Sequence, residues 1–259
     1  MKKLIYFIIV ASCYADLLGQ WDLEKRIQLA KKPSSYAVDS QDQLYLGFED
    51  GSMIKFSAQG KEHLNYALSN QSPVTLIDPQ FQLKTFLFLF DNQSVIILDR
   101  FSGLPKKYEL RDLTLNIVSS SCPAPDGTFW IIENNPIVLK RLNPNQNQVI
   151  VETQPEVQGK ILHMRAYQNI LLVLDEIALH LFDQFGTRLS SFNCETQFFQ
   201  VKDDLVFVVV DDHLVGLEIF GNLSLSSKVK LPVSGAIWLQ TESMYLAILE
   251  NSIEYYRRQ

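Results

Sequence analysis

The side chains with the widest chemical range in this sequence are its four histidines, His63, His163, His180 and His213. Histidine binds metal ions and gains or loses a proton near neutral pH, so each one is a candidate catalytic or ligand-binding residue. His163 is the strongest candidate because Arg165 lies two residues further along the same stretch. An imidazole near a guanidinium could bind an anionic or sugar-like molecule. The other three histidines are interpreted as surface or packing residues.

The common catalytic and cofactor-binding motifs are absent from the sequence. It contains no phosphate-binding loop, dinucleotide fingerprint, zinc-ligand spacing or nucleophile elbow. Acidic pairs such as Asp203-Asp204 lack the alternating spacing and the closing glutamate of a calcium loop, so they are interpreted as turn residues. We therefore expect no catalytic residue, no metal and no cofactor, and we predict that the chain is not an enzyme.

The overall composition is that of a globular protein. Of the 259 residues, 47% are hydrophobic and 20% are charged, which excludes a disordered chain. The formal net charge is -6, whereas a protein that binds nucleic acid needs a basic face. We therefore expect no nucleic-acid partner.

A pair of β-strands recurs along the whole chain. The first member of each pair is a nearly continuous apolar run, at residues 44–48, 85–89, 128–132, 170–174, 205–209 and 244–248. The second member follows a short turn rich in Asp, Glu and Asn, at residues 53–56, 95–98, 137–140, 177–180, 214–217 and 252–255. The period of about 40 residues is that of a four-stranded propeller blade.

The sixth copy of this repeat lacks a fourth strand, because the sequence ends at Gln259. Residues 21–29 precede the first copy and have the alternating pattern of the missing strand. Pairing of these residues with the last copy would supply its missing strand and close the ring, whereas an open ring leaves edges exposed. We therefore predict an all-β fold, a six-bladed β-propeller whose ring is closed by an N-terminal strand that pairs with the last blade.

The first strand of each predicted blade borders the central channel, so its polar side chains are candidates for ligand binding. These side chains are Tyr36, Thr75, Ser119, Ser121, His163, Arg165, Gln197, Gln200, Trp238 and Gln240. From them we select six candidate ligand-binding residues at the channel mouth: Tyr36, Ser121, His163, Arg165, Trp238 and Gln240. In the alternative interpretation, the channel holds only water and its polar lining is simply solvated.

The first 20 residues have the layout of an export signal. Lys2 and Lys3 precede an apolar run over residues 4–12, which is shorter than the roughly 20 residues of a membrane-spanning helix. We predict a signal peptide at 1–20, a single propeller domain at 21–259 and no transmembrane span. Residues 10–13 resemble a lipobox, which would make Cys13 the site of a lipid anchor. The alternative is cleavage after Ala15 or Gln20.

The two remaining cysteines are predicted to be free. Cys122 falls on the inner strand of the third predicted blade, and Cys194 follows the outer strand of the fourth. Strands of a sheet are about 4.8 Å apart, so the width of a blade separates the two residues by more than disulfide geometry allows. We therefore expect no disulfide between Cys122 and Cys194.

Three stretches resemble six-bladed propellers of the NHL and quinoprotein-like type, in particular uncharacterised cell-envelope proteins of Bacteroidota. They are QLYLG at 43–47, DGTFW at 126–130 and LFDQFGT at 181–187. The resemblance covers the chain after the leader, and its motifs belong to strands and turns. It implies the propeller fold and a location in the periplasm or at the outer membrane, but no activity.

Two functions are compatible with these observations. The leading hypothesis is a non-catalytic scaffolding or interaction module that binds protein partners in the cell envelope. It follows from the export signal, the rigid repeat and the absence of catalytic motifs. The alternative is a ligand-binding or hydrolytic propeller with its site at the mouth of the central channel.

Overall fold

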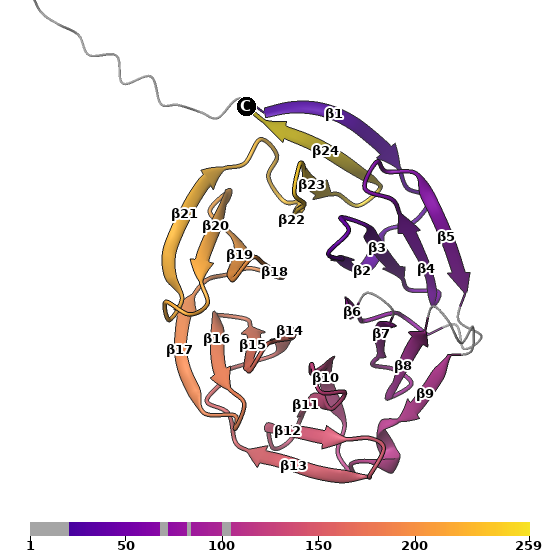
Figure 1. Cartoon of the computed structure of the whole chain (residues 1–259), viewed down its shortest axis with the longest axis vertical. Helices are drawn as coiled ribbons and strands as arrows, with labels where there is room; N and C mark the ends of the chain where they lie inside the picture. The colour runs from indigo at the N-terminus through magenta and orange to yellow at the C-terminus, as the bar shows by residue number, and fades with distance from the viewer. Residues whose placement is uncertain (1–20, 68–71, 82–83, 100–104) are drawn as a thin grey trace, which may run out of the picture.

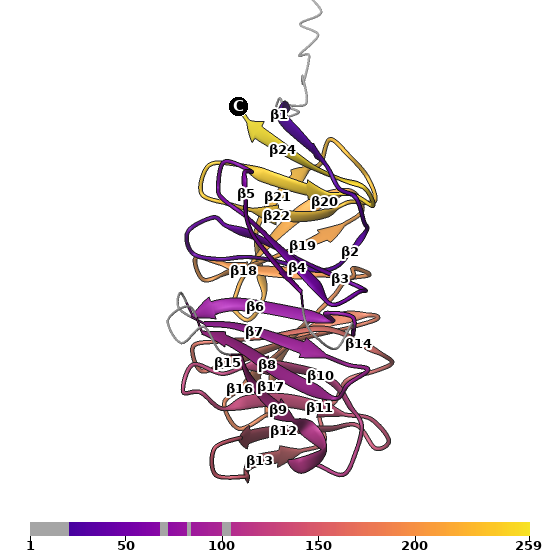
Figure 2. The same ribbon diagram turned by 90° about the vertical axis from the view of Figure 1, so that its right-hand side faces the viewer.

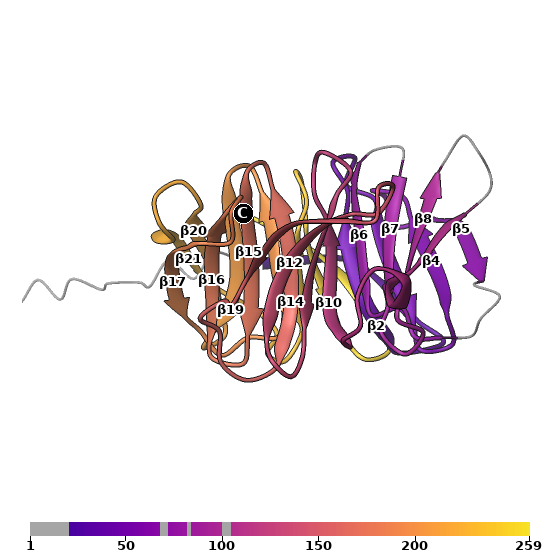
Figure 3. The same cartoon turned by 90° about the horizontal axis from the view of Figure 1, so that it is seen from below.

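The structure is a computed structural model that describes residues 21–67, 72–81, 84–99 and 105–259. Six antiparallel sheets of four strands each stand as blades around a central axis (Figure 1). Seen from the side, the ring is shallow, and the strands of each blade run between its two faces (Figures 2 and 3). The prediction of a six-bladed β-propeller is confirmed.

The blades are numbered in chain order, and within each blade the strands run outward from the axis. Blade 1 contains β2 (Pro33–Val38), β3 (Leu44–Phe48), β4 (Ser52–Phe56) and β5 (Glu62–Ala67). Blade 2 contains β6 (Leu76–Phe81), β7 (Lys84–Leu89), β8 (Ser94–Asp99) and β9 (Lys106–Glu109), and the short helix η1 (Leu110–Asp112) follows it. Blade 3 contains β10 (Val118–Pro123), β11 (Phe129–Glu133), β12 (Val138–Asn143) and β13 (Gln148–Thr153).

The remaining three blades have the same order. Blade 4 contains β14 (Ile161–Tyr167), β15 (Ile170–Asp175), β16 (Ala178–Asp183) and β17 (Arg188–Asn193). Blade 5 contains β18 (Phe199–Lys202), β19 (Leu205–Val210), β20 (His213–Glu218) and β21 (Ser224–Lys230). Blade 6 contains β22 (Ile237–Gln240), β23 (Tyr245–Ile248), β24 (Ser252–Arg258) and, as its outer strand, β1 (Trp21–Gln28).

The ring closes through the N-terminal strand. β1 pairs antiparallel with β24, with Trp21 opposite Arg258 and Gln28 opposite Ser252. The Trp21 indole donates a hydrogen bond to the carbonyl of Lys230 in blade 5 and contacts the Tyr245 ring edge-on, with a centroid distance of 4.9 Å. The closing strand predicted from residues 21–29 is therefore present and fixes blade 6 between its neighbours.

The hydrophobic core is divided among the spaces between blades. The second strands are the most deeply buried, as in β11, where all five residues are buried, because a neighbouring blade covers each face. Separate apolar clusters join blades 1 and 2, blades 2 to 4, blades 4 and 5, blades 5 and 6, and blades 6 and 1. Each blade is therefore held by both of its neighbours.

The acidic turns predicted from the repeat form the hairpins between strands. In blade 5, Asp203 and Asp204 connect β18 to β19, and Asp211 and Asp212 connect β19 to β20. All four residues have positive φ angles of 49° to 61°, a conformation that Asp and Asn adopt more readily than most residues. Their carboxylates belong to tight turns at opposite ends of β19.

The predictions for the cysteines, for a membrane span and for the leader have different outcomes. Cys122 and Cys194 are both buried and free. Within the described residues, no helix has the length and apolar character needed to cross a bilayer. The predicted signal peptide at 1–20 and the lipidation site at Cys13 lie outside the described residues, so export and lipidation stay predictions.

We expect the closing strand to be essential to the stability of the whole ring. A chain that begins at Leu29 lacks β1, which exposes the edge of β24 and removes the Trp21 contacts with blade 5. Its free energy of unfolding should fall by at least about 3 kcal/mol relative to a chain that begins at Trp21. Urea unfolding followed by far-ultraviolet circular dichroism measures the difference. Equal midpoints for the two chains would contradict the role given to β1.

Candidate functional site

A cavity of about 1030 Å³ opens at one mouth of the central channel, and we call it the channel-mouth cavity. The first strands of blades 1 to 4 begin at this mouth, and the hairpins between the second and third strands of blades 2 to 4 surround it. Its lining includes Ser34–Tyr36, Thr75–Ile77, Phe90, Asp91, Ser119, Ser120, Asn134, Asn135, Ile137, 159–163, Glu176 and 195–198. Five blades therefore contribute to one site.

β-Bulges shape the cavity wall. The pairing of the first two strands is irregular between Pro33 and Ser35, between Val118 and Ser120, and between Ile161 and His163. The residues that these bulges insert are Ser34, Ser119 and Leu162, and all three line the cavity. A bulge redirects a side chain that a regular strand would point toward a neighbouring blade. The same irregularity in three blades thus places three inserted residues in the cavity wall.

Three rings form the inner end of the cavity, and we call them the aromatic layer: Tyr36, His163 and Phe198. The Phe198 ring lies 5.1 Å from the Tyr36 ring and 4.7 Å from the His163 ring, measured between centroids. Among the cavity-lining residues of β2 and β14, Tyr36 and His163 are the ones furthest along their strands from the mouth. The aromatic layer therefore joins blades 1, 4 and 5, and its mutually inclined rings can contact an aromatic group of a bound molecule.

Burial controls the protonation of the two titratable rings in the aromatic layer. Removal from water, together with the nearby Arg165 guanidinium, lowers the pKa of His163 from 6.5 to about 3. Burial also raises the pKa of Tyr36 above its ordinary value. At neutral pH both rings are uncharged, so the imidazole can accept a hydrogen bond from a ligand.

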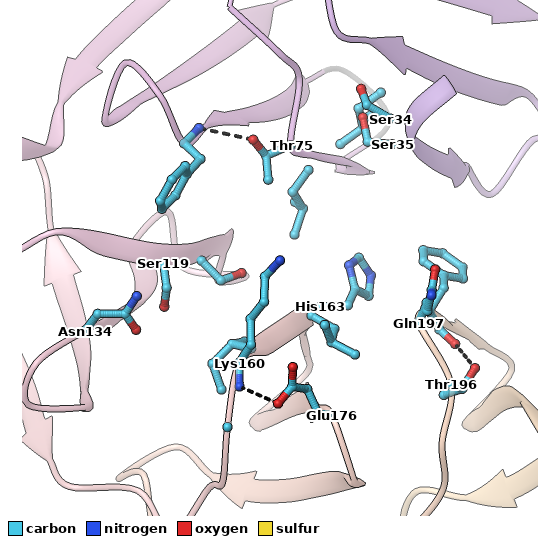
Figure 4. A pocket seen from close by; sticks show the side chains of 18 of the residues that line it. Ser34, Ser35, Thr75, Ser119, Asn134, Lys160, His163, Glu176, Thr196 and Gln197 are labelled. Carbon is cyan, nitrogen blue, oxygen red and sulfur yellow. Dashed lines mark hydrogen bonds between the residues drawn. The ribbon is translucent and has the colours of Figure 1, made fainter. Parts of the chain in front are cut away.

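Lys160 brings the positive charge of the cavity. Its side chain extends into the open space, and its ammonium group lies between Ser119 and His163 (Figure 4). No ion pair engages this ammonium within the described residues. An unpaired cation that points into a cavity is suited to bind a carboxylate or another anionic group.

The turn between β15 and β16 holds Lys160 in place. Asp175, at the end of β15, accepts a 2.8 Å hydrogen bond from the backbone N–H of Gln158, and Glu176 accepts one from the backbone N–H of Lys160 at 3.3 Å. Gly159 between them has a φ of +73°, and a Cβ there would lie only 2.4 Å from a Glu176 carboxylate oxygen. The positive φ favours glycine at this position, and a larger residue would also have to displace the Glu176 carboxylate.

The structure separates the six ligand-binding residues selected from the sequence. Tyr36 and His163 meet in the channel-mouth cavity, and the other four lie outside its lining. Ser121 is fully buried in β10, next to two residues that do line the cavity, Ser119 and Ser120. The Arg165 guanidinium lies beyond the aromatic layer, 3.9 Å from the Asp78 carboxylate.

Trp238 and Gln240 have structural contacts in blade 6. Trp238 is 3% exposed, and its ring packs against Trp21 and Tyr256 between blades 5 and 6. The backbone N–H of Gln240 donates a 2.6 Å hydrogen bond to the Gln200 side chain, which in turn donates to the Gln240 carbonyl. These contacts join the first strands of blades 5 and 6.

Several cavity residues escaped the sequence interpretation. Lys160 and Phe198 each come directly before a first strand, and Glu176 belongs to a hairpin. Thr75 and Gln197, which precede the first strands of blades 2 and 5, were among the predicted lining residues, whereas Lys160 and Phe198 were assigned no role. The available signal was position: in each blade, the residues that precede the first strand lie at the same mouth.

Neither a metal-binding cluster nor the other three histidines form a second candidate functional site within the described residues. Within residues that the structure describes, no three or more His, Cys, Asp and Glu side chains are grouped to hold a metal ion. His180 is buried and lies 2.8 Å from the Asp175 carboxylate, as expected for a packing residue. His63 is exposed on β5, and His213 is partly exposed at the start of β20.

Solved structures with a similar fold include those of an enzyme. Virginiamycin B lyase from Staphylococcus aureus superposes with a TM-score of 0.61 and 12% sequence identity, over 93% of this chain and 100% of that one. A catalytically inactive histidine-to-alanine variant of that enzyme, with quinupristin, has a TM-score of 0.62 at 10% identity, over 93% and 100% of the two chains. A streptogramin B lyase gives 0.62 and 10%, over 92% and 98%.

Sequence comparison adds no relative to this set. No family model matches the chain, and no curated protein matches it. Identities of 10–12% to the solved structures show a shared fold alone. The assignment to an envelope group of Bacteroidota stays a prediction.

The structural comparison corrects the functional hypothesis drawn from the sequence. The chain was interpreted as a non-catalytic scaffold and not as an enzyme because it lacks familiar catalytic motifs. The similar structures are those of a propeller enzyme, so this inference from absent motifs is wrong. Side chains that are distant in sequence can meet on a propeller, as Tyr36, Lys160 and Phe198 do here.

The low pKa of His163 predicts how acid affects stability. Between about pH 6.5 and pH 3 the unfolded chain binds a proton at this residue and the folded chain does not, so acid favours unfolding. The variant His163→Gln lacks this proton-binding group. When the pH is lowered from 7.5 to 5, its free energy of unfolding should therefore fall by about 2 kcal/mol less than that of the wild type. Urea unfolding at the two pH values measures this. His63→Gln is the control, and identical pH profiles for wild type and His163→Gln would refute the assignment.

Proposed function

We propose that this protein binds a small molecule in the channel-mouth cavity, and that the molecule carries an anionic group and a flat apolar group. The observation that carries the proposal is the Lys160 ammonium, which points into the same space as the aromatic layer (Figure 4). The cavity volume of about 1030 Å³ lies at the upper end of the usual range for small-molecule sites.

The arrangement assigns a different part of the ligand to each side of the cavity. Lys160 binds the anionic group, because a charge-assisted hydrogen bond in a partly enclosed site is stronger than one in water. Tyr36 and Phe198 contact the flat group at the inner end. Polar side chains such as Asn134 and Gln197, which are exposed at the rim, can adapt their hydrogen bonds to the remainder of the molecule.

Binding can be tested with N-acetylphenylalanine, which has a carboxylate and an aromatic ring, and with its amide, which lacks the charge. The acid should raise the melting temperature more than the amide does. Lys160→Met should weaken binding of the acid about 10- to 100-fold, which corresponds to the loss of one charge-assisted hydrogen bond. Isothermal titration calorimetry measures the dissociation constants.

The control for this measurement is Lys61→Met, which removes an exposed lysine near the start of β5, outside the cavity. It should leave the affinity unchanged. The proposal fails if the acid and its amide bind equally well, or if Lys160→Met binds the acid as tightly as the wild type does.

A second candidate function is catalysis on the bound molecule. It is supported by an unprotonated imidazole and an ammonium group in one cavity, which can accept and donate a proton, and by the enzymes that share the fold. A bound anion near His163 would raise the pKa of this imidazole from about 3 and make it a stronger base. His163 and Lys160 would then act as proton acceptor and proton donor.

Conversion can be measured by mass spectrometry and chromatography after incubation with compounds that bind, quinupristin included. The wild type should convert at least one of them, and His163→Gln, measured at saturating concentrations of the compound, should convert it at least about 100-fold more slowly. Recovery of every bound compound unchanged would dismiss catalysis and leave the binding function in place.

A further inference from the structure

A second hollow lies beside the channel-mouth cavity, and we call it the side groove. It has a volume of about 550 Å³ and is lined by Ile177, Asn193, Cys194, Glu195, Val210 and Asp211. These residues come from the β15–β16 hairpin of blade 4, the β19–β20 hairpin of blade 5 and the segment that joins the two blades. The side groove is therefore on the same face of the ring as the channel mouth.

The two hollows adjoin. Glu195 lines both of them, and the neighbouring residues Glu176 and Ile177 line one each. The segment of residues 195–197 runs along the edge of the channel-mouth cavity, where Figure 4 shows Thr196 and Gln197. A ligand that fills the cavity can thus continue over this segment into the side groove.

The segment between the hollows offers free backbone donors. The N–H of Cys194 is hydrogen-bonded to the Ile177 carbonyl, but the N–H groups of Glu195, Thr196 and Gln197 make no hydrogen bond with any described part of the chain. Consecutive unpaired backbone groups on an accessible segment can pair with the backbone of an extended peptide. This feature favours a ligand with amide groups at regular spacing.

The charges along this path are negative. Glu176, Glu195 and Asp211 are all exposed, and none of the three forms an ion pair within the described residues. Among the residues that the structure describes, no lysine or arginine lines the side groove, and the Ile177 side chain beside it is 47% exposed. The path from the channel mouth therefore leads from the ammonium of Lys160 to carboxylates and an apolar side chain.

We propose that the molecule bound at this site is the C-terminal part of a basic peptide. This inference rests on the proposed binding function and assigns its ligand class. The terminal carboxylate contacts Lys160, the last side chain meets the aromatic layer, and the preceding backbone pairs with residues 195–197. Basic side chains further from the terminus then lie in the side groove, near Glu195 and Asp211.

The test compares two N-acetylated pentapeptides with free C-terminal carboxylates. One has the sequence lysine–alanine–lysine–alanine–phenylalanine, and in the other glutamate replaces both lysines. The basic peptide should bind at least about tenfold more tightly than N-acetylphenylalanine, and the acidic one should gain nothing over it. Raising the salt concentration should reduce the advantage of the basic peptide, because exposed charges are screened.

Two variants test the groove directly. Asp211→Asn should weaken binding of the basic peptide about threefold, as expected for an exposed charge pair, without changing the affinity for N-acetylphenylalanine. Glu195 lines both hollows, so Glu195→Gln is scored by the ratio of the two affinities, which should fall about threefold. The matched control is Asp203→Asn. Asp203 is also exposed, has a φ of 50° against 49° for Asp211, and lies in the turn at the other end of β19.

Hydrogen exchange gives an independent measurement. The amides of residues 195–197 should exchange more slowly when the basic peptide is bound, and those of the Asp203-Asp204 turn should be unaffected. The inference is overturned if the two pentapeptides bind equally well, if Asp211→Asn and Glu195→Gln have no effect, or if neither peptide binds. In each of these outcomes, Lys160-dependent binding of N-acetylphenylalanine would still support the proposed function.

Discussion

Apolar side chains between neighbouring blades hold the ring together, because a single four-stranded sheet cannot bury both of its faces alone. Every blade therefore needs a neighbour on each side, and the six interfaces form a closed cycle. The pairing of β1 with β24 completes this cycle, since it supplies the outer strand of blade 6. The positions of all cavity residues depend on that closure.

The chemistry of the site is a consequence of the ring. Tyr36, His163 and Phe198 belong to three blades, and they meet because the blades converge on the axis. The same convergence partly shields His163 from water, which lowers its pKa. Lys160 remains exposed because it precedes the first strand, at the mouth of the channel. The aromatic rings thus lie deep along the axis, where the blades converge, and the charged groups lie at the rim.

The sequence was sufficient to predict the blades, the closing strand and five of the residues that line the cavity. Apolar second strands and acidic turns repeat with a fixed period, and β1 was recognisable because the last repeat lacked a strand. The depth of each side chain along the channel was not predictable. Trp238 and His163 both occupy first strands, yet Trp238 packs between blades, because the two faces of a strand look toward different neighbours. Contacts between segments distant in sequence, such as Tyr36 with Phe198, require the folded ring.

Ring closure by the N-terminal strand also determines when folding can finish. Trp21 pairs with Arg258, so the first and last strands of the described chain must meet before blade 6 is complete. Such a contact has almost the greatest sequence separation that the chain allows, and folds dominated by distant contacts form slowly. Blades 1 to 5 can assemble from local hairpins while the polypeptide is still being synthesised, but the ring can close only after the final strand has emerged. Until then, blade 6 has no outer strand, and the edge of β24 is open to pairing with other chains.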